Sequence, residues 1–548
     1  MCGIALYNTK TSQLKDGFIE FLEGQPILDG VFPLQNTLFK QIVPLISSRG
    51  PNYASLRSSK IHSTAWFSSV LSLRDPFTKQ CVEVSDCFVL QYNGELYNDD
   101  VVHNDTQYFS SLLQEIAENK TPPEFEDAIL NVISLLEGEF AYTISDLKNA
   151  KIYFGRDPVG KRSLSYLVDM DSNGDLYIAS VTGRTEQIFT DCLAGAVYIF
   201  DVKTRTLTVN TKPTIRKEYH VSPSIDLSYS LLDSVVKELY EVLYIATKRR
   251  VETIHPAHIE NSPISVLFSG GLDCSVIVAL ICECLRESFQ GKDKVTDSPT
   301  FVPTLELLNV AFENPRAKMM PKDASDRLLA QSSANTLRAL YPEIDIRLVE
   351  IDVSYREYCD CREKVIDLMY PKNTEMDLSI AIAFYFASRG KGFTFVRAPD
   401  GNSGCRVPYK RKGIVLFSGL GADELYGGYH KFANKDTKAL VEELTKQINN
   451  IHDRNLNRDD KVIADNGVEV RYPYLDCNVI EYSTMHIPIN YKRDKFILRE
   501  LATRRLALGS IAGEPKRAIQ FGSKSAKMTK DGNKNGTDIL KNVVKQAV

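Results

Sequence analysis

The stretch from Val266 to Ile281 constrains the fold of this chain more than any other. It reads Val-Leu-Phe-Ser-Gly-Gly-Leu-Asp-Cys-Ser-Val-Ile-Val-Ala-Leu-Ile, so an apolar strand leads through a tight Ser-Gly-Gly loop into an apolar run long enough for a helix. This order aims free backbone N–H groups and the positive end of a helix dipole at a phosphate group. The stretch therefore predicts an α/β unit that binds phosphate.

A second stretch, Val415 to Asp423, repeats this pattern as Val-Leu-Phe-Ser-Gly-Leu-Gly-Ala-Asp. An Asp follows the Ser-Gly pair in both stretches, Asp273 in the first and Asp423 in the second. If both strands lie in one parallel sheet, their carboxyl ends share an edge and the two carboxylates face one site. Either stretch alone is equally compatible with a buried strand that ends in a glycine turn. The pair favours a Mg²⁺–nucleotide site.

Composition limits the classes of protein to which the chain can belong. Its 548 residues are too many for one core, so we expect about two to four domains. With 43% hydrophobic and 25% charged residues the chain is typical of a globular protein, and a net charge of -4 argues against nucleic acid as a partner. The sequence shows neither an apolar run of membrane-spanning length nor the pattern of a signal peptide, so we expect no membrane partner. The 11 cysteines lack a paired framework, which predicts a reducing, cytoplasmic location.

The first part of the chain, residues 1–216, reads mainly as short strands bounded by Gly, Asn and Asp. Helical patterns interrupt the strands at about Gln107–Asn119 and Pro123–Leu136. This order predicts an α+β fold of two stacked antiparallel sheets with flanking helices. The expected strands are Ile4–Tyr7, Phe88–Tyr92, Phe140–Ser145, Lys151–Phe154, Leu176–Ser180 and Val197–Val202.

Cys2 is a candidate nucleophile in this part. A small residue after the initiator Met normally permits removal of that Met, which would make Cys2 the free amino terminus. A thiol beside its own α-amine has a base of suitable basicity built in, so no separate His is needed. Taken alone the Met-Cys start is weak evidence, because any protein can begin this way.

Polar motifs later in the same part strengthen this hypothesis. Asn93 and Gly94, at a strand end, offer a side-chain amide and a backbone N–H, the parts of an oxyanion hole, although a simple Asn-Gly turn has the same sequence. Arg49, before Gly-Pro-Asn, can hold a carboxylate by its guanidinium fork, and Asp105, before Thr-Gln, can hold an ammonium. Arg49 and Asp105 would together bind the α-carboxylate and the α-ammonium group of a free amino acid.

These motifs resemble the class II glutamine amidotransferase domain. The resemblance rests on Met1-Cys-Gly-Ile, Arg49-Gly-Pro, Asn93-Gly-Glu-Leu-Tyr-Asn, Asp105-Thr and Arg156-Asp-Pro-Val-Gly. It implies an N-terminal-nucleophile hydrolase fold that converts glutamine to glutamate and ammonia, with Cys2 as the attacking thiol and Asn93 and Gly94 as the oxyanion hole. The glutamine-binding residues that it implies are Arg49, Asn93, Gly94, Glu95 and Asp105. One departure is Asn52, where the usual motif has Asp.

The second part of the chain, residues 226–530, alternates strands with helices. This alternation predicts βαβ units and a parallel sheet, followed by helices toward the carboxyl end. Beyond the two loops, the expected elements are helices over Leu231–Val251, Asp326–Leu340 and Asp377–Ser388 and strands over Leu307–Phe312 and Ile346–Ile351. Residues 531–548 are rich in Lys and predict a basic flexible tail.

The Ser269–Ser275 loop resembles the pyrophosphate loop of the ATP-pyrophosphatase group and differs from a Walker A loop, because no Gly-Lys-Ser/Thr follows. Two further motifs, over Ser418–Tyr429 and Gly467–Asp476, are similar to those of the asparagine synthetase family. The resemblance spans both parts of the chain in the family's order and implies ATP and Mg²⁺ as cofactors. The ATP and pyrophosphate ligands that it implies are Phe268, Ser269, Gly270, Gly271, Asp273, Ser275, Val310, Ser418 and Gly419. It also implies Asp273 and Asp423 as Mg²⁺ ligands and Lys516 as a catalytic lysine that neutralises charge at the α-phosphate.

Leu420 is the important departure from that family. Asparagine synthetases have Glu at this position for the acyl-adenylate chemistry, whereas Leu cannot accept a proton, bind metal or orient ammonia. Together with the late Pro-Lys-Arg-Ala-Ile-Gln-Phe-Gly-Ser, the loop most resembles the branch called asparagine synthetase domain-containing protein 1.

Three functions stay open at this point. The first is a glutamine- and ATP-dependent amidotransferase that converts aspartate to asparagine, and the second is the same enzyme with a different acceptor. The third is a nucleotide-binding regulatory or interaction protein that has lost synthesis. We expect small-molecule partners, namely glutamine, ATP and an amino-acid or other carboxylate acceptor, and we allow for a homodimer.

Overall fold

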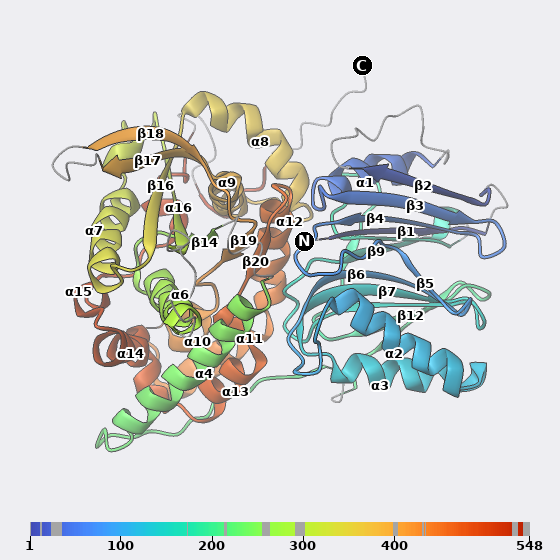
Figure 1. The fold of residues 1–548 in the computed structure, drawn as a ribbon, viewed down its shortest axis with the longest axis horizontal. Helices are drawn as coiled ribbons and strands as arrows, with labels where there is room; N and C mark the ends of the chain where they lie inside the picture. The colour runs from blue at the N-terminus through green and yellow to red at the C-terminus, as the bar shows by residue number, and fades with distance from the viewer. Residues whose placement is uncertain are drawn as a thin grey trace, which may run out of the picture.

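Two stacked antiparallel sheets form the first half of the chain (Figure 1). The computed structural model describes residues 2–10, 14–22, 36–172, 174–212, 216–254, 263–290, 302–397, 404–429, 432, 434–528 and 535–540. The strands of this half are β1 (Gly3–Asn8), β2 (Gly17–Leu22), β3 (Tyr53–Ser59), β4 (Thr64–Val70), β5 (Val82–Val84), β6 (Phe88–Leu96), β7 (Gly138–Asp146), β8 (Lys151–Arg156), β9 (Ser165–Asp169), β10 (Asp175–Ala179), β11 (Thr190–Asp191), β12 (Val197–Asp201) and β13 (Thr206–Asn210). One sheet has the order β11-β9-β10-β1-β4-β3-β2 and the other the order β13-β12-β8-β7-β6-β5.

Strand β1 shows why these sheets are buried on both faces. Ile4 and Leu6 pack in one apolar cluster with residues of the second sheet, whereas Ala5 and Tyr7 belong to the cluster that includes helix α1 (Thr37–Ser47). Side chains alternate between the two faces of a strand. The first sheet packs against the second sheet with one face and against α1 with the other, so both of its faces must be apolar. Helices α2 (Asp105–Asn119) and α3 (Phe125–Leu135) cover the second sheet (Figure 1). The predicted stacked antiparallel fold is confirmed.

A third sheet organises the second half of the chain. Its order is β18-β17-β16-β15-β14-β19-β20. The five neighbouring strands β16, β15, β14, β19 and β20 run parallel to one another. Its strands are β14 (Ile264–Leu267), β15 (Thr304–Phe312), β16 (Asp345–Val353), β17 (Lys391–Arg397), β18 (Gly404–Lys410), β19 (Val415–Phe417) and β20 (Glu469–Arg471). The helices are α4 (Leu232–Glu252), α6 (Leu272–Gln290), α7 (Ser325–Leu340), α8 (Tyr355–Met369), α9 (Glu375–Arg389), α10 (Ala422–Tyr426), α11 (Thr437–Asn449), α12 (Asn457–Ala464), α13 (Cys477–Met485), α14 (Phe496–Leu506), α15 (Gly509–Ala512) and α16 (Ile519–Gly522).

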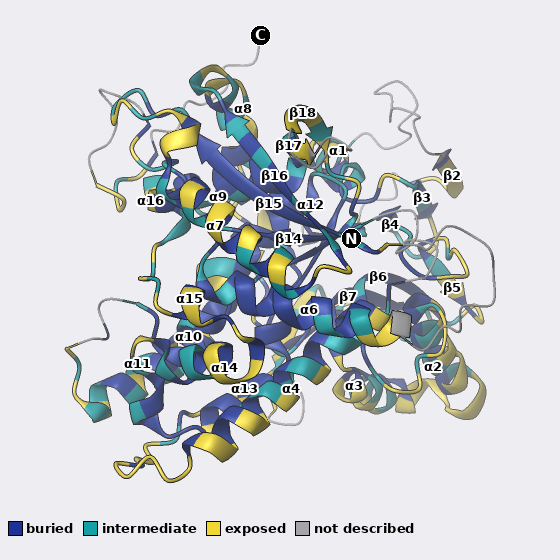
Figure 2. Cartoon of the chain, turned by 60° about the vertical axis from the view of Figure 1, so that its left-hand side comes forward, coloured by how far each residue is buried: buried dark blue, intermediate teal, exposed yellow. Residues whose placement is uncertain are grey.

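Strands β14 and β19 are parallel neighbours, with Val266 opposite Phe417. Both glycine loops therefore open at the same edge of the sheet, as the repeated motif predicts. Helix α6 follows the first loop, and its central part is apolar all round, since every residue of Val276–Cys282 is fully buried (Figure 2). The antiparallel hairpin of β17 and β18 was not among the expected strands. It extends the sheet beyond β16, on the side away from β20.

Part of the predicted tail over residues 531–548 is held against helix α9. The Leu540 N–H donates to the carbonyl oxygen of Asn373 at 2.8 Å, and the Leu540 side chain is 4% exposed. Residues 535–540 therefore do not form a free tail. The rest of that predicted segment lies outside the described residues.

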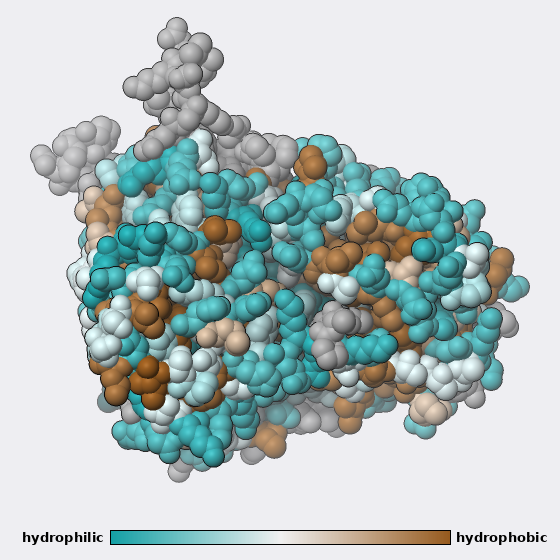
Figure 3. Space-filling view, turned by 90° about the horizontal axis from the view of Figure 1, so that it is seen from below, coloured by the Kyte–Doolittle hydropathy of each residue, from teal (hydrophilic) through white to brown (hydrophobic). Residues whose placement is uncertain are grey.

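The face of the molecule seen from below is largely polar. Figure 3 shows teal hydrophilic residues over much of this face, with the brown apolar residues gathered mainly over its right-hand part. None of the helices in the described part of the chain is long and apolar enough to cross a membrane.

Candidate functional site

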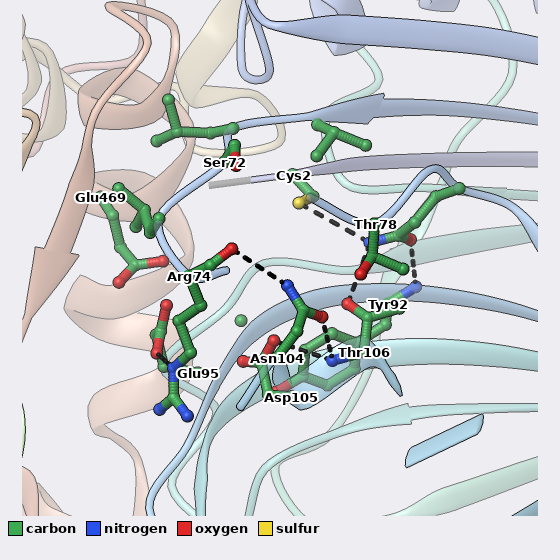
Figure 4. A pocket seen from close by; sticks show the side chains of 15 residues that line it. Cys2, Ser72, Arg74, Thr78, Tyr92, Glu95, Asn104, Asp105, Thr106 and Glu469 are labelled. Atoms are coloured by element: carbon green, nitrogen blue, oxygen red, sulfur yellow. Dashed lines mark hydrogen bonds and ion pairs between the residues drawn. The ribbon is translucent and has the colours of Figure 1, made fainter. Parts of the chain in front are cut away.

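Cys2 immediately precedes β1 and lines a small cavity of about 30 Å³ (Figure 4). The other lining residues are Val70, Leu71, Ser72, Leu73, Arg74, Thr78, Gln80, Tyr92, Gly94, Glu95, Asn104, Asp105, Thr106 and Glu469. Burial raises the pKa of the Cys2 thiol to about 11, and the amino-terminal charge opposes this shift. The groups around the sulfur therefore decide how readily the thiolate forms.

Asn93 and Gly94 of β6 have the features that an oxyanion hole requires. Gly94 has a φ of +152°, and a Cβ built there would lie 2.1 Å from the carbonyl oxygen of Glu139, so no other residue fits. Asn93 is fully buried, and neither its Nδ2 nor its Oδ1 has a hydrogen-bond partner among the described residues. A buried amide without partners is costly, so it is available to a ligand. Gly94 lines the cavity, whereas the Asn93 side chain is not part of its wall.

Arg49, the residue expected to bind the glutamine carboxylate, does not line this cavity. Its Nη2 lies 2.9 Å from Asp460 Oδ2 of α12, and its Nε donates to the Cys2 carbonyl oxygen at 3.2 Å. Arg74 is the arginine of the cavity wall. It lies in Arg74-Asp-Pro, which repeats the tripeptide Arg156-Asp-Pro, and this repetition is the sequence signal that could have identified it.

Three carboxylates face the same cavity, from Glu95, Asp105 and Glu469. Burial raises the pKa of Glu95 to about 7, although Arg74 and Arg471 lower it. Burial likewise raises the pKa of Asp105. A cavity of this charge suits a ligand that brings an ammonium group as well as a carboxylate.

Glu469 belongs to β20, so the second half of the chain supplies part of the wall around Cys2 (Figures 1 and 4). Arg471, two residues later, lies 3.2 Å from Glu95 and 2.9 Å from Glu469. Arg162 of the first half contacts Glu139 at 3.3 Å and Glu469 at 3.9 Å. All these side chains are nearly or fully buried. The motif that contains Glu469 and Arg471 therefore joins the two halves through ion pairs, a role that sequence reasoning missed.

The two glycine loops of the second half border a larger pocket of about 400 Å³. Of the predicted ATP ligands, Phe268, Ser269, Asp273, Val310, Ser418 and Gly419 line it, together with Asp423 and Lys516. Gly270, Gly271 and Ser275 lie in or just after the first loop but do not line the pocket. Gly270 has a φ of +82°, and a Cβ there would lie 2.5 Å from the Ala330 nitrogen, so the close contact between the loop and α7 requires glycine.

Asp273 and Asp423 converge, as the repeated motif predicts, and an ammonium group lies between them. Lys495 Nζ is 2.6 Å from Asp273 and 2.5 Å from Asp423, and Lys516 also contacts Asp423. Burial alone would raise the pKa of Asp423, but Lys495 and Lys516 lower it to about 2. Sequence reasoning missed Lys495, which no local pattern marks. Its φ of +58° is a strained conformation of the kind found at functional sites.

The donor set fits Mg²⁺ bound together with a nucleotide. Two carboxylates at one point are what Mg²⁺ takes from a protein when phosphate oxygens and water complete its shell. Among the described residues, no cluster of three or more His, Cys, Asp or Glu could hold a metal ion by itself. The remaining ligands would therefore come from the nucleotide and water.

Leu420 lines this pocket beside Gly419 and packs partly against the core. The same pocket is also lined by Tyr429, Arg454 and Arg458. Arg458 is held by Asp377 at 2.9 Å and by Asp459 at 2.8 Å. The pocket wall thus carries cationic and carboxylate groups, but Leu420 itself offers no proton acceptor.

Comparison with protein families matches the two halves separately. Residues 73–184 match the glutamine amidotransferase domain, and residues 241–442 and 433–542 match asparagine synthase. The chain therefore combines a glutamine amidotransferase domain with an asparagine synthase domain, and the second of these implies the use of ATP. It belongs to the asparagine synthase family, as the motifs indicate.

Relatives extend the match to the whole chain. The chain is 56% identical over 544 residues, 99% of each chain, to the asparagine synthetase domain-containing protein YML096W of Saccharomyces cerevisiae. It is 26% identical to asparagine synthetase domain-containing protein 1 of Homo sapiens, over 89% of this chain and 92% of the relative. It is 24% identical to a probable glutamine-hydrolyzing asparagine synthetase of Schizosaccharomyces pombe, over 67% of this chain and 59% of the relative.

Proposed function

We propose that this chain is a glutamine- and ATP-dependent amidotransferase with aspartate as the default acceptor and asparagine, AMP and pyrophosphate as products. One observation carries the proposal. A thiol pocket and a nucleotide-sized pocket occur in one chain, and Glu469 of the second half forms part of the wall of the first pocket. This arrangement supports a reaction in which the product of one site is used by the other. We take residues 1–216 and 226–530 as the two domains.

In the first pocket, the α-amine of processed Cys2 would take the thiol proton as the sulfur attacks the side-chain amide carbon of glutamine. The carbonyl electrons would move to oxygen, where Asn93 Nδ2 and the Gly94 N–H would stabilise the charge. Collapse of this intermediate would expel ammonia, with a proton from the α-amine of processed Cys2, and leave a thioester. Attack by water would then release glutamate and restore the thiol.

In the second pocket, an acceptor carboxylate would attack the α-phosphorus of ATP and release pyrophosphate. Lys495 and Lys516 would neutralise the charge that develops on the phosphates. Mg²⁺ held by Asp273 and Asp423 would supply further positive charge at the phosphate oxygens. Ammonia from the first pocket would pass through the interior of the protein and displace AMP from the acyl carbon.

Arg74, in place of Arg49, is our proposed ligand for the glutamine carboxylate. Its side chain uses three donors, toward Glu95, His103 and Leu96, and a guanidinium has about five, so two N–H groups remain for a ligand. We expect Arg74→Met to raise the KM for glutamine by about tenfold or more, because a hydrogen-bonded ion pair is lost.

Arg49→Met is the comparison for this experiment. Removing Arg49 takes one cation from the buried Asp460 carboxylate, which keeps Arg162 at 3.8 Å, so we expect a loss of about 1.5–3 kcal/mol in the free energy of unfolding rather than a selective rise in KM. Glutaminase kinetics and chemical denaturation of both variants check the prediction. A selective KM effect in Arg49→Met with none in Arg74→Met would restore the original assignment.

Leu420 favours a second candidate, an amidotransferase with a different acceptor. Leu420 lines the pocket at the position where a proton-accepting side chain would serve aspartate chemistry. The test supplies glutamine, Mg-ATP and a panel of amino-acid and other carboxylate acceptors, and follows pyrophosphate and glutamate. Pyrophosphate that depends on aspartate supports the default reaction, and pyrophosphate that depends on another compound supports the second candidate. If no acceptor yields pyrophosphate, the nucleotide-binding regulatory protein replaces both.

The cellular location proposed for this enzyme is the cytoplasm. All 11 cysteines are free thiols in the structure, which agrees with a reducing compartment. Fractionation of cells that express the tagged chain tests this assignment.

A further inference from the structure

The side chain of Gln80 lies beside the candidate nucleophile. Its Nε2 is 3.7 Å from Cys2 Sγ, within the range of a hydrogen bond to sulfur, and this contact is drawn as the dashed line at Cys2 in Figure 4. Gln80 is 2% exposed and lines the same cavity. None of the roles described above uses this amide.

The neighbours of Gln80 determine which end of its amide faces the sulfur. The backbone N–H of Tyr92 donates to Gln80 Oε1 at 2.8 Å. A backbone N–H can only donate, so the oxygen must face Tyr92 and the NH₂ group must face Cys2. The second Nε2 contact, to Thr106 Oγ1 at 3.5 Å, agrees with this orientation because a hydroxyl oxygen can accept.

Tyr92 also connects Gln80 to the predicted oxyanion hole, since it directly precedes Asn93 and Gly94 on β6. The Gln80 side-chain amide thus contacts both β6, the strand that carries the predicted oxyanion donors, and the Cys2 sulfur atom. We propose that Gln80 is a positioning residue for Cys2, whose side-chain N–H donates to the thiolate and holds it in line with the Asn93–Gly94 strand. This inference rests on the proposed glutaminase function and deepens it.

Gln80 would act on the thiolate before attack and would transfer no proton itself. A hydrogen bond to the charged form of a group favours that form, so the contact would help to form the thiolate against the effect of burial. Other charged groups also face the sulfur. The terminal amine lowers the pKa of the thiol, whereas Asp105 and Glu469 raise it. Arg74 and Glu95 lie in the same cavity wall.

The test measures the rate at which iodoacetamide alkylates Cys2 between about pH 6 and pH 10 in the full-length chain, by mass spectrometry of the amino-terminal peptide. We expect Gln80→Met, which keeps the volume and removes the donor, to raise the apparent pKa and to slow alkylation at neutral pH by about tenfold. We expect kcat for glutamate formation to fall by a similar factor, with KM for glutamine changed much less.

Gln91→Met is the matched control. Gln91 is also a buried glutamine, and its Nε2 donates to the Phe67 carbonyl oxygen and to Ser68 Oγ, both at 2.9 Å. It does not line the Cys2 cavity. Its replacement should lower stability but leave the pH profile of Cys2 alkylation unchanged.

Two results would overturn the inference. One is an unchanged alkylation profile in folded Gln80→Met, and the other is the same change in Gln91→Met. Should Gln80→Met fail to fold, Gln80→Glu keeps the shape and the acceptor for Tyr92 but places a carboxylate oxygen at the sulfur. We then expect a still slower alkylation at neutral pH, and a wild-type profile in that variant would also reject the inference. Wild-type chain that forms no glutamate would reject the proposed function separately, because alkylation does not require turnover.

Discussion

Replacement of Cys2 by Ala is expected to abolish glutamate formation from glutamine, by about 10³-fold or more, and to spare synthesis from free ammonia and ATP. The thioester requires a thiol, and among the described residues that line the cavity Cys2 is the one cysteine. The second pocket contains none of the atoms that change, so ammonia supplied from solution would still reach the acyl carbon. Glutamate and pyrophosphate assays with glutamine or with ammonium salts measure both halves of this expectation.

Cys87→Ala is the control for the Cys2 experiment. Cys87 is a partly buried free thiol in the same half of the chain and does not line the cavity. Its variant should keep both activities. Glutamate formation that survives in Cys2→Ala would refute the assignment of the nucleophile.

Asp423→Asn is expected to reduce acceptor-dependent pyrophosphate release by about 100-fold or more while glutaminase activity persists. Asp423 contacts both Lys495 and Lys516, and it is one of the two proposed Mg²⁺ ligands. The low pKa of its carboxyl, about 2, keeps it ionised throughout the neutral range, so its charge is present during turnover. An amide of the same shape removes this charge, which takes the Asp423 carboxylate from Lys516, leaves Lys495 paired with Asp273 alone, and weakens metal binding.

Asp436→Asn provides the matched change of charge. Asp436 is exposed and caps helix α11 by accepting a hydrogen bond from the Ala439 N–H, a role that Asn also fills. This variant should behave as the wild type. Pyrophosphate release that is unaffected in Asp423→Asn would contradict the proposed nucleotide site, and joint loss of glutaminase activity would indicate a general loss of folding instead.

Local patterns in the sequence predict the elements of the fold well. Apolar runs that end at glycine loops mark β14 and β19, and their pairing in one parallel sheet brings Asp273 and Asp423 together as expected. The β17–β18 hairpin was not predicted. Strand β18 is largely exposed and contains Pro408, which argues against a strand in a sequence, and β17 pairs mainly with β18 at the end of the sheet.

The sites were predicted less completely, because several of their residues act over long distances along the chain. Arg49 and Arg74 are both arginines near polar turns, and only the packing of α12 shows that Arg49 pairs with Asp460 while Arg74 lines the Cys2 cavity. Lys495 lies 222 residues from Asp273 along the chain. Neither the Arg49–Asp460 pair nor the Lys495–Asp273 pair leaves a periodic or local signal in the sequence.

The sequence by itself determined the two kinds of domain and the parallel arrangement of the strands before the two glycine loops, and it predicted Cys2, Asp273 and Asp423 as the central groups. The strands and loops follow from hydrophobic periodicity, and the kinds of domain follow from motifs that resemble known families. Both depend on residues close together in the chain. Only the tertiary structure decided which charged and polar groups surround those centres. Burial allows an ion pair or an amide to orient a reactive atom, and burial arises when segments such as β20 and the first half of the chain meet in space.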